Sequence, residues 1–261
     1  MFQAASILCE CVDIVRRSGE IIRAHWSGPR RVRHKGSIDL VTETDLAVEA
    51  FLKEKLAALL PGAAFMAEES SAADRDPGAL CWIIDPVDGT TNFVHRIPQV
   101  GTSVALWQEG QVTLGIVNVP MLDECFWAAR GQGAFCNNRS IAVSGADTLT
   151  EALVGTGFPY DVAERLPEVL ERLAAVLPVS QGLRRIGAAS VDLAYLACGR
   201  LDAFYEAGLK PWDLAAGWLL VEEAGGRVSN LRNESLRFGE ALLASNGRLH
   251  KAMTALLAET A

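Results

Sequence analysis

The chain has 261 residues, and 24 Lys and Arg against 32 Asp and Glu give a formal net charge of −8. Half of its residues are hydrophobic, which excludes a disordered chain because ample apolar surface is available to offset the ordering entropy. The acidic balance argues against general nucleic-acid binding, which depends on neutralising phosphates. No stretch approaches the roughly 18 consecutive apolar residues that cross a bilayer. The N-terminal residues also lack the pattern of a secretory signal, so we expect a cytoplasmic protein without membrane contact.

The N-terminal region predicts two helices. Apolar residues at helical spacing predict an amphipathic helix over residues 3–25. A second helix is predicted over residues 45–60, with Thr42 or Thr44 as its cap and a Pro-Gly pair at its end. The polar stretch between the two helices is expected to be short and extended.

The middle of the chain predicts a run of antiparallel strands. Each strand is a short apolar run, and the Glu109-Gly110 pair between two of them is typical of a hairpin turn. The predicted strands cover residues 81–85, 100–107, 112–119, 124–129 and 134–143.

The rest of the chain alternates between strands and helices. Strands are predicted over residues 154–157, 202–205 and 241–245, and helices over residues 161–177, 188–199, 213–224 and 247–259. Helices, then antiparallel strands, then alternating elements predict a layered α+β fold. A soft boundary near Gly145 predicts one domain in two lobes, approximately residues 1–145 and 146–261.

Carboxylates occur in three places that apolar packing does not explain: Glu68-Glu69, the segment from Asp85 to Asp88, and Asp213. Asp85 ends an apolar run, and we expect the following proline to force a turn. The N–H groups that follow Asp88 would face outward at the start of a helix, as they do in phosphate sites.

Carboxylates beside a phosphate cradle need cations between them, because both groups are negative. If Glu68, Asp85, Asp88 and Asp213 converge, two divalent ions would neutralise them. Oxygen ligands favour Mg²⁺, with Mn²⁺ as the second choice. Locally, other interpretations stay open: Asp213 as a helix N-cap, Glu68 as a solvated surface acid and Asp85 as a turn residue.

The sequence resembles the inositol monophosphatase family. The combination of Asp-Pro-x-Asp-Gly-Thr with a downstream Trp-Asp carries the resemblance, together with matching segments in family order over nearly the whole chain. It implies a layered αβαβα sandwich of the inositol monophosphatase and fructose-1,6-bisphosphatase type. The matching segments are residues 35–45, 67–70, 82–95, 199–211 and 212–217.

The resemblance also implies a set of metal ligands. Glu68, Asp85 and the carbonyl of Val87 would hold a first ion. Asp85, Asp88 and Asp213 would hold a second, and Glu68 would hold a third through water. Two or three Mg²⁺ ions are therefore expected in the N-terminal, metal-binding lobe.

The same resemblance implies catalytic and substrate-binding residues. Asp45 and Thr90 would orient the attacking water, with Glu68 as the third catalytic residue. Glu206 would accept a hydrogen bond from an inositol hydroxyl, and the loop over residues 35–39 would close over the metals. Ala188 and Ala189 stand where relatives frequently carry Ser or Thr. The substrate-binding residues implied are Asp88, Gly89, Thr90, Gly187, Ala189 and Glu206.

The expected function is Mg²⁺-dependent hydrolysis of a small polyol or sugar phosphate, with inositol 1-phosphate preferred. Alternative substrates within the family are fructose 1,6-bisphosphate, histidinol phosphate and 3′-phosphoadenosine 5′-phosphate. The resemblance further implies a homodimer and inhibition by lithium.

Functions of other classes are also considered. The haloacid dehalogenase pattern Asp-x-Asp-Gly-Thr is one residue shorter than the spacing from Asp85 to Asp88 here. The basic residues between Arg30 and Lys35 leave open an RNA- or polymerase-associated regulatory role. The sequence also predicts that His250 lies on the surface.

Overall fold

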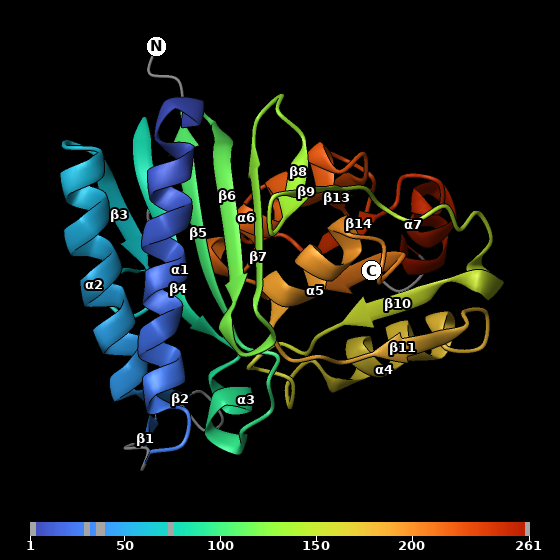
Figure 1. The fold of residues 1–261 in the computed structure, drawn as a ribbon. Helices are drawn as coiled ribbons and strands as arrows, with labels where there is room; N and C mark the ends of the chain where they lie inside the picture. Colours follow the sequence, from blue (N-terminus) through green and yellow to red (C-terminus); the bar gives the residue numbers. More distant parts are fainter. Residues whose placement is uncertain (1–3, 29–31, 35–39, 73–75, 259–261) are drawn as a thin grey trace.

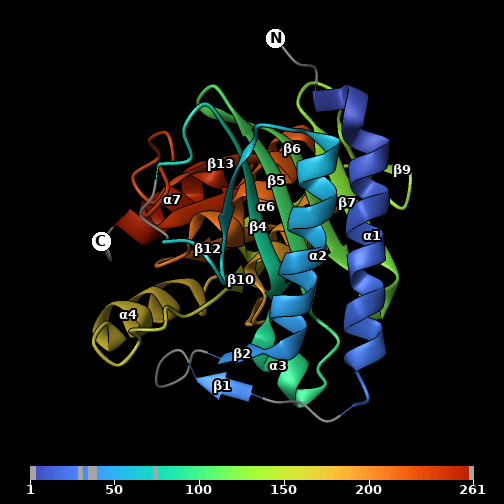
Figure 2. The same ribbon diagram turned by 90° about the vertical axis from the view of Figure 1, so that its left-hand side faces the viewer.

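The computed structural model describes residues 4–28, 32–34, 40–72 and 76–258. Three layers of helices alternate with two sheets, as Figures 1 and 2 show from perpendicular directions. The order is α1 and α2, a seven-stranded sheet, α5 and α6, a five-stranded sheet, then α4 and α7. This arrangement confirms the predicted layered α+β sandwich.

The first layer contains α1 (Leu8–His25), preceded by the 3-10 turn η1 (Ala4–Ile7), and α2 (Glu43–Leu59). Helix α2 begins at a capping box: the Thr42 hydroxyl accepts the Thr44 N–H at 3.1 Å, and Asp45 Oδ2 accepts the Thr42 N–H at 2.9 Å. Both predicted N-terminal helices are therefore present. The extended stretch between them contains β1 (Val32–His34) and β2 (Leu40–Thr42), which pair antiparallel.

The first sheet has the strand order β3-β4-β5-β6-β7-β8-β9, and only its β3–β4 pair is parallel among the described residues. Its predicted hairpin at Glu109-Gly110 is present. The prediction of one strand over residues 134–143 is wrong, because Asn137 and Asn138 adopt φ of 47° and 65° and turn the chain into a further hairpin. The strands are β3 (Ala64–Ala67), β4 (Leu80–Asp88), β5 (Gly101–Gln108), β6 (Gln111–Val119), β7 (Glu124–Ala129), β8 (Ala134–Cys136) and β9 (Arg139–Ile141).

Strand β4 differs from its prediction at Pro86. The proline does not turn the chain; the strand continues to Asp88, with an irregularity between Asp85, opposite Ser103, and Asp88, opposite Gly101. A residue without an N–H is tolerated at such a bulge, where no ladder hydrogen bond is lost. The short helix α3 (Thr90–His95) follows directly.

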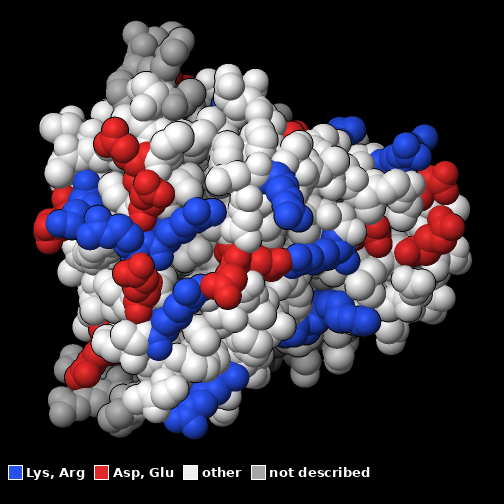
Figure 3. Space-filling view, in the orientation of Figure 1, with Lys and Arg blue, Asp and Glu red and all other residues white. Residues whose placement is uncertain are grey.

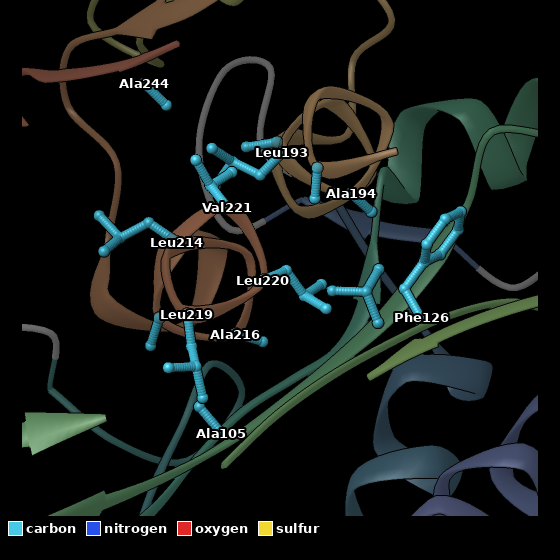
Figure 4. Close-up of a cluster of buried hydrophobic side chains, with 14 of the residues drawn as sticks. Ala105, Phe126, Leu193, Ala194, Leu214, Ala216, Leu219, Leu220, Val221 and Ala244 are labelled. Carbon is cyan, nitrogen blue, oxygen red and sulfur yellow. The ribbon is translucent and has the colours of Figure 1, made fainter. Parts of the chain in front are cut away.

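Helices α5 (Ala189–Ala197) and α6 (Pro211–Glu223) form the central layer. Figure 4 shows Leu219, Leu220 and Ala216 of α6 packed toward Ala105 and Phe126 of the first sheet. Both helices are buried nearly all round, which explains why their sequences show no strong amphipathic pattern.

The second sheet has the strand order β11-β10-β12-β14-β13 and is mixed, with β10 parallel to β11 and β12. Outer helices α4 (Leu166–Val176) and α7 (His250–Ala258) complete the sandwich; α4 is shorter than its prediction. The division near Gly145 into two lobes stays a prediction. The strands are β10 (Leu153–Thr156), β11 (Gly182–Arg184), β12 (Ala203–Glu206), β13 (Arg227–Asn230) and β14 (Leu242–Ser245), and two further 3-10 turns are η2 (Pro120–Leu122) and η3 (Leu149–Glu151).

The surface position predicted for His250 is wrong. Its side chain is buried, with Nε2 2.8 Å from Ser229 Oγ and Nδ1 2.9 Å from Ser245 Oγ. Across the described ranges, no helix combines the length and the apolar character that a membrane span requires.

Candidate functional site

The candidate site is a pair of adjoining cavities where β4, α3, α5 and α6 meet. The first has a volume of about 260 Å³ and the second about 290 Å³, and both are bordered by Asp88, Gly89, Thr90, Tyr160 and Asp213. The first cavity is also lined by Glu68, Ser71, Asp85, Val87, Lys210 and Trp212. The second extends to Arg185, Gly187, Ala188, Ala189, Asp192 and Glu206, among others.

The irregular end of β4 places Asp85 and Asp88 at the first cavity. Asp85 Oδ1 accepts the Val87 N–H at 3.0 Å. Asp88 Oδ2 accepts two hydrogen bonds from Ser190 in the first turn of α5, from its N–H at 2.7 Å and its hydroxyl at 2.5 Å. Ser190 is a residue of the candidate site that the sequence does not predict; its local signal is a serine at a helix start close to Gly187.

Asp213 comes from the start of α6, but not as the N-cap. Lys210 holds that position, and Asp213 is the third helical residue, where Oδ2 accepts the Lys210 N–H at 2.6 Å. In return, the Asp213 N–H donates to the Lys210 carbonyl at 3.1 Å, and the two contacts together resemble a capping box. Asp213 therefore stabilises the start of α6 and also lines the cavity.

Glu68 lies on the turn that follows β3. Its N–H donates to the Ile84 carbonyl at 3.1 Å, which continues the β3–β4 pairing by one residue. Ser71 Oγ accepts the Ala67 N–H at 3.0 Å. The turn is also held by Glu49 of α2, whose carboxylate accepts the Glu69 N–H at 3.0 Å; the sequence does not predict this role.

Asp45 meets the site through Thr90. The Thr90 hydroxyl lies 3.0 Å from Asp45 Oδ1 and 3.0 Å from the Val87 carbonyl oxygen, so it can donate to either. Burial raises the pKa of Asp45, and hydrogen bonds from Thr42 and Thr90 oppose that rise. The contact joins residues 45 positions apart, between α2 and the start of α3.

The acids of the first cavity raise one another's pKa values. The pKa of Asp85 is well above its ordinary value because of burial and then the charges of Glu68, Asp88 and Asp213. Burial, followed by the charge of Asp88, also places the pKa of Asp213 well above its ordinary value. Burial raises the pKa of Asp88, and the hydrogen bonds from Ser190 oppose that rise. A cation would reverse this effect by favouring the charged forms.

The donor set fits a hard cation that keeps part of its water. Carboxylate and carbonyl oxygens are the ligands that Mg²⁺ prefers, and Mg²⁺ usually retains several waters. Within the described ranges, no group of three or more His, Cys, Asp or Glu side chains has an arrangement that could already hold a metal ion. The acids instead border a cavity with space between them.

The second cavity holds the predicted substrate residues Gly187, Ala189 and Glu206. Burial raises the pKa of Glu206 to about 8, and the positive charge of Arg185 opposes the rise. Gly187 adopts φ of +89°, a conformation that side-chain-bearing residues rarely adopt. The sequence does not predict Asp192, a further buried acid on this wall.

The structure thus places all the predicted side chains of the two cavities at one locus, with Asp45 joined to it through Thr90. The predicted covering loop over residues 35–39 lies outside the described residues. The same holds for most of the basic run between Arg30 and Lys35.

Comparisons with known proteins identify the family of this chain. A family model described as the inositol monophosphatase family matches residues 4–261. Inositol-1-monophosphatase from Synechocystis sp. is 39% identical over 95% of this chain and 87% of its own length. Nus factor SuhB from Pseudomonas aeruginosa is 42% identical over 85% of this chain and 84% of its own length.

A solved structure carries the likeness to the whole fold. Inositol monophosphatase from Anabaena superposes with a TM-score of 0.89 at 33% identity, covering 99% of this chain and 97% of that one. Matches of this extent in both sequence and structure make the chain a member of the inositol monophosphatase family and a phosphoric monoester hydrolase.

Proposed function

We propose that this phosphatase hydrolyses myo-inositol 1-phosphate to inositol and phosphate with Mg²⁺. The observation that carries the proposal is that Glu68, Asp85, Asp88 and Asp213, from three separate parts of the chain, border one cavity beside Thr90. Inositol monophosphatases generally depend on metal ions, and this donor set is the one a hard cation would use.

The proposed ligands are the residues that the family resemblance implies, and all of them line the first cavity. Glu68, Asp85 and the Val87 carbonyl would hold one ion, and Asp85, Asp88 and Asp213 a second, with Mn²⁺ able to replace Mg²⁺. Mg²⁺ held there would supply the activation of water and the charge neutralisation that phosphate ester hydrolysis needs. A third ion through Glu68 is part of the same proposal.

Asp45 and Thr90 would position the attacking water. Their hydrogen bond at 3.0 Å keeps the hydroxyl oxygen and the carboxylate together, next to Val87. A carboxylate with a raised pKa is a suitable acceptor for the proton that the water loses, through the threonine hydroxyl. The burial of Asp45 keeps bulk water away from this pair.

Gly89 and Thr90 would bind the phosphate through their backbone N–H groups. Gly89 adopts φ of +86°, and an added Cβ would lie 3.0 Å from the Gln99 carbonyl oxygen and 3.1 Å from Ala188 Cβ. A side chain there would therefore press on the neighbouring chain at Gln99 and Ala188, and the positive φ also favours glycine.

The second cavity supports a polyol as the alcohol part. Glu206 offers a carboxyl group to a hydroxyl, and Gly187 and Ala189 leave room for a ring. A second phosphate would need a strongly basic wall, whereas Arg185 is the single Lys or Arg among the described residues that line this cavity. Fructose 1,6-bisphosphate and 3′-phosphoadenosine 5′-phosphate, which carry a second phosphate, are therefore weaker candidates. Histidinol phosphate, a monophosphate, is the remaining alternative substrate.

The family also supports three properties that complete the proposal: a homodimer, inhibition by Li⁺ and a cytoplasmic location. Sedimentation velocity measures the first, and inhibition of phosphate release by LiCl measures the second. Fractionation of the source cells tests the third.

A regulatory role in transcription is the second candidate, because relatives named Nus factor SuhB are 37–42% identical to this chain. On the face drawn in Figure 3, basic and acidic side chains are interleaved, and this does not favour extensive RNA contact. A role of this class would survive Asp85→Asn, whereas hydrolysis would not.

The experiment that tests the proposed function is phosphate release from the four named esters, with 5′-AMP as a control, with and without Mg²⁺. Inositol 1-phosphate should turn over fastest, and chelation of the metal should abolish turnover. Absence of metal-dependent release from every ester would contradict the proposal.

A further inference from the structure

The acids on the two sides of the site differ in how protein groups hold them. Asp85, Asp88 and Asp213 each accept at least one hydrogen bond from a backbone N–H or a hydroxyl. Asp192 and Glu206 both line the second cavity. Over the described ranges, neither of these two carboxyl groups forms a hydrogen bond with the protein. Both carboxyl groups therefore border the second cavity without a hydrogen-bond donor from the described part of the protein.

Asp192 is the more unusual member of this pair. It lies on α5, is 1% exposed, and its Oδ1 is buried without a partner. Its neighbours along the helix, Val191 and Leu193, are fully buried apolar residues. An apolar side chain at position 192 would suit this environment better than an unpartnered carboxyl, so packing alone does not explain the acid.

Strand β10 and the residue that follows it leave space for both carboxyl groups. An added Cβ at Gly157 would lie 2.1 Å from Glu206 Oε2, and one at Gly155 would lie 3.0 Å from Asp192 Oδ1. Neither glycine has a positive φ, so the space rather than the backbone conformation explains the absence of side chains there. The backbone at Gly155 and Gly157 thus lies directly against the carboxyl pair.

The charge around the pair disfavours a second phosphate. The Arg185 guanidinium stacks over Phe158, with Cζ 5.4 Å from the ring centroid, and its charge opposes the rise in the pKa of both acids. Burial raises the pKa of Asp192 well above its ordinary value, and the charges of Glu206 and Asp88 raise it further. Two carboxyl groups facing one cation suit neutral hydroxyl groups better than an anion.

We propose that Asp192 is a specificity-determining residue for the alcohol part of the substrate: with Glu206 it forms a carboxyl pair that hydrogen-bonds the hydroxyl groups of a polyol. This inference rests on the proposed phosphatase function and adds a residue to its substrate selection. A substrate whose alcohol part lacks hydroxyl groups gains nothing from the pair.

Two esters and two variants test the proposal. Myo-inositol 1-phosphate carries ring hydroxyls, whereas p-nitrophenyl phosphate carries none. Asp192→Leu, similar in size but unable to hydrogen-bond, should lower kcat/KM for inositol 1-phosphate about tenfold relative to p-nitrophenyl phosphate. Asp192→Asn keeps a donor and an acceptor, so the ratio should fall about threefold or less.

A matched control is Asp202→Asn. Asp202 is also buried, but each of its carboxylate oxygens accepts a hydrogen bond from the protein, one from the Ser144 hydroxyl and one from the Leu153 N–H. This variant should lower the melting temperature and leave the substrate ratio unchanged. If Asp192→Leu lowers both rates by the same factor, or neither, the acid has no part in selection and the inference is overturned.

The experiment separates the two proposals. Wild-type hydrolysis of both esters with an unchanged ratio in Asp192→Leu overturns the assignment of Asp192 alone. Absence of Mg²⁺-dependent hydrolysis of either ester by the wild type overturns the proposed function and, with it, the role of Asp192.

Discussion

Glu49 Oε2 accepts the backbone N–H of Glu69 at 3.0 Å, so that helix α2 holds the turn that follows β3. Oε1 of the same carboxylate accepts the Ser70 hydroxyl at 2.5 Å and pairs with Lys53 at 3.1 Å. Asp45, Glu49 and Lys53 are spaced by four residues and therefore share one face of α2. One helix face thus links the Asp45 contact to the turn that carries a predicted metal ligand.

Replacement of Glu49 by leucine should weaken both stability and hydrolysis. The variant leaves the Glu69 N–H and the Ser70 hydroxyl without their acceptor, which should lower the free energy of unfolding by about 1–3 kcal/mol. Because the turn carries Glu68, kcat/KM for inositol 1-phosphate should fall as well. Glu49→Gln keeps one acceptor oxygen, so its effects on stability and hydrolysis should be intermediate.

Urea unfolding and phosphate release measure the two effects, and Glu54→Leu at an exposed site of the same helix is the control. Equal effects in the two leucine variants would contradict the role of Glu49.

Ser190→Ala should disturb Asp88 specifically. The variant removes the hydroxyl donor at 2.5 Å but keeps the backbone donor at 2.7 Å, so Asp88 remains held by one bond. We expect a loss of about 1 kcal/mol in the free energy of unfolding and a higher Mg²⁺ concentration for half-maximal activity. Titration of activity with MgCl₂ measures the second effect. Thr148→Ala, which removes an exposed hydroxyl, should change neither quantity. An unchanged Mg²⁺ requirement in Ser190→Ala would show that the hydroxyl does not position Asp88.

Asp88→Asn should abolish turnover without unfolding the protein. The charge of Asp88 raises the pKa values of Asp85 and Asp213, so its removal relieves repulsion in the metal-free protein. The melting temperature without metal should therefore equal or exceed that of the wild type. Differential scanning calorimetry and phosphate release provide the two readings. A variant with wild-type rates would show that the reaction centre lies elsewhere.

His250 should make the protein less stable in acid. Burial lowers its pKa from 6.5 to about 4, so between these values the unfolded chain binds more protons than the folded protein. The free energy of unfolding is therefore unaffected by titration of this histidine above pH 6.5. It declines as the pH falls from 6.5 toward 4, by up to about 3 kcal/mol. His250→Gln lacks this titration, so its stability should fall less steeply over that range. Denaturant unfolding at several pH values compares the slopes, and parallel curves would exclude His250 as the cause.

Local sequence accounts for much of the fold. The capping box at Thr42 and the hairpin at Glu109-Gly110 follow from a few adjacent residues, and both are present. Pro86 shows the limit of local reasoning. A proline predicts a turn, but β4 continues through Pro86 with only an irregularity in its pairing. Pairing with β5 and burial of the strand stabilise this continuation.

Residues of the candidate site that the sequence does not predict act across long separations. Ser190 binds Asp88 102 positions away, and Glu49 binds Ser70 21 positions away. Neither residue type is unusual at its place in a helix. Asp192 is equally inconspicuous, because no local pattern distinguishes a buried acid on a helix from a solvated one.

The sequence by itself determined the acidic motifs, their order along the chain and the layered architecture, because these depend on short patterns of residue type. Only the tertiary structure decided which protein groups hold these acids and that a further acid, Asp192, lines the second cavity. That outcome depends on how helices α2, α5 and α6 pack against β4, and such packing brings distant residues within hydrogen-bond distance through the burial of apolar surface along the whole chain.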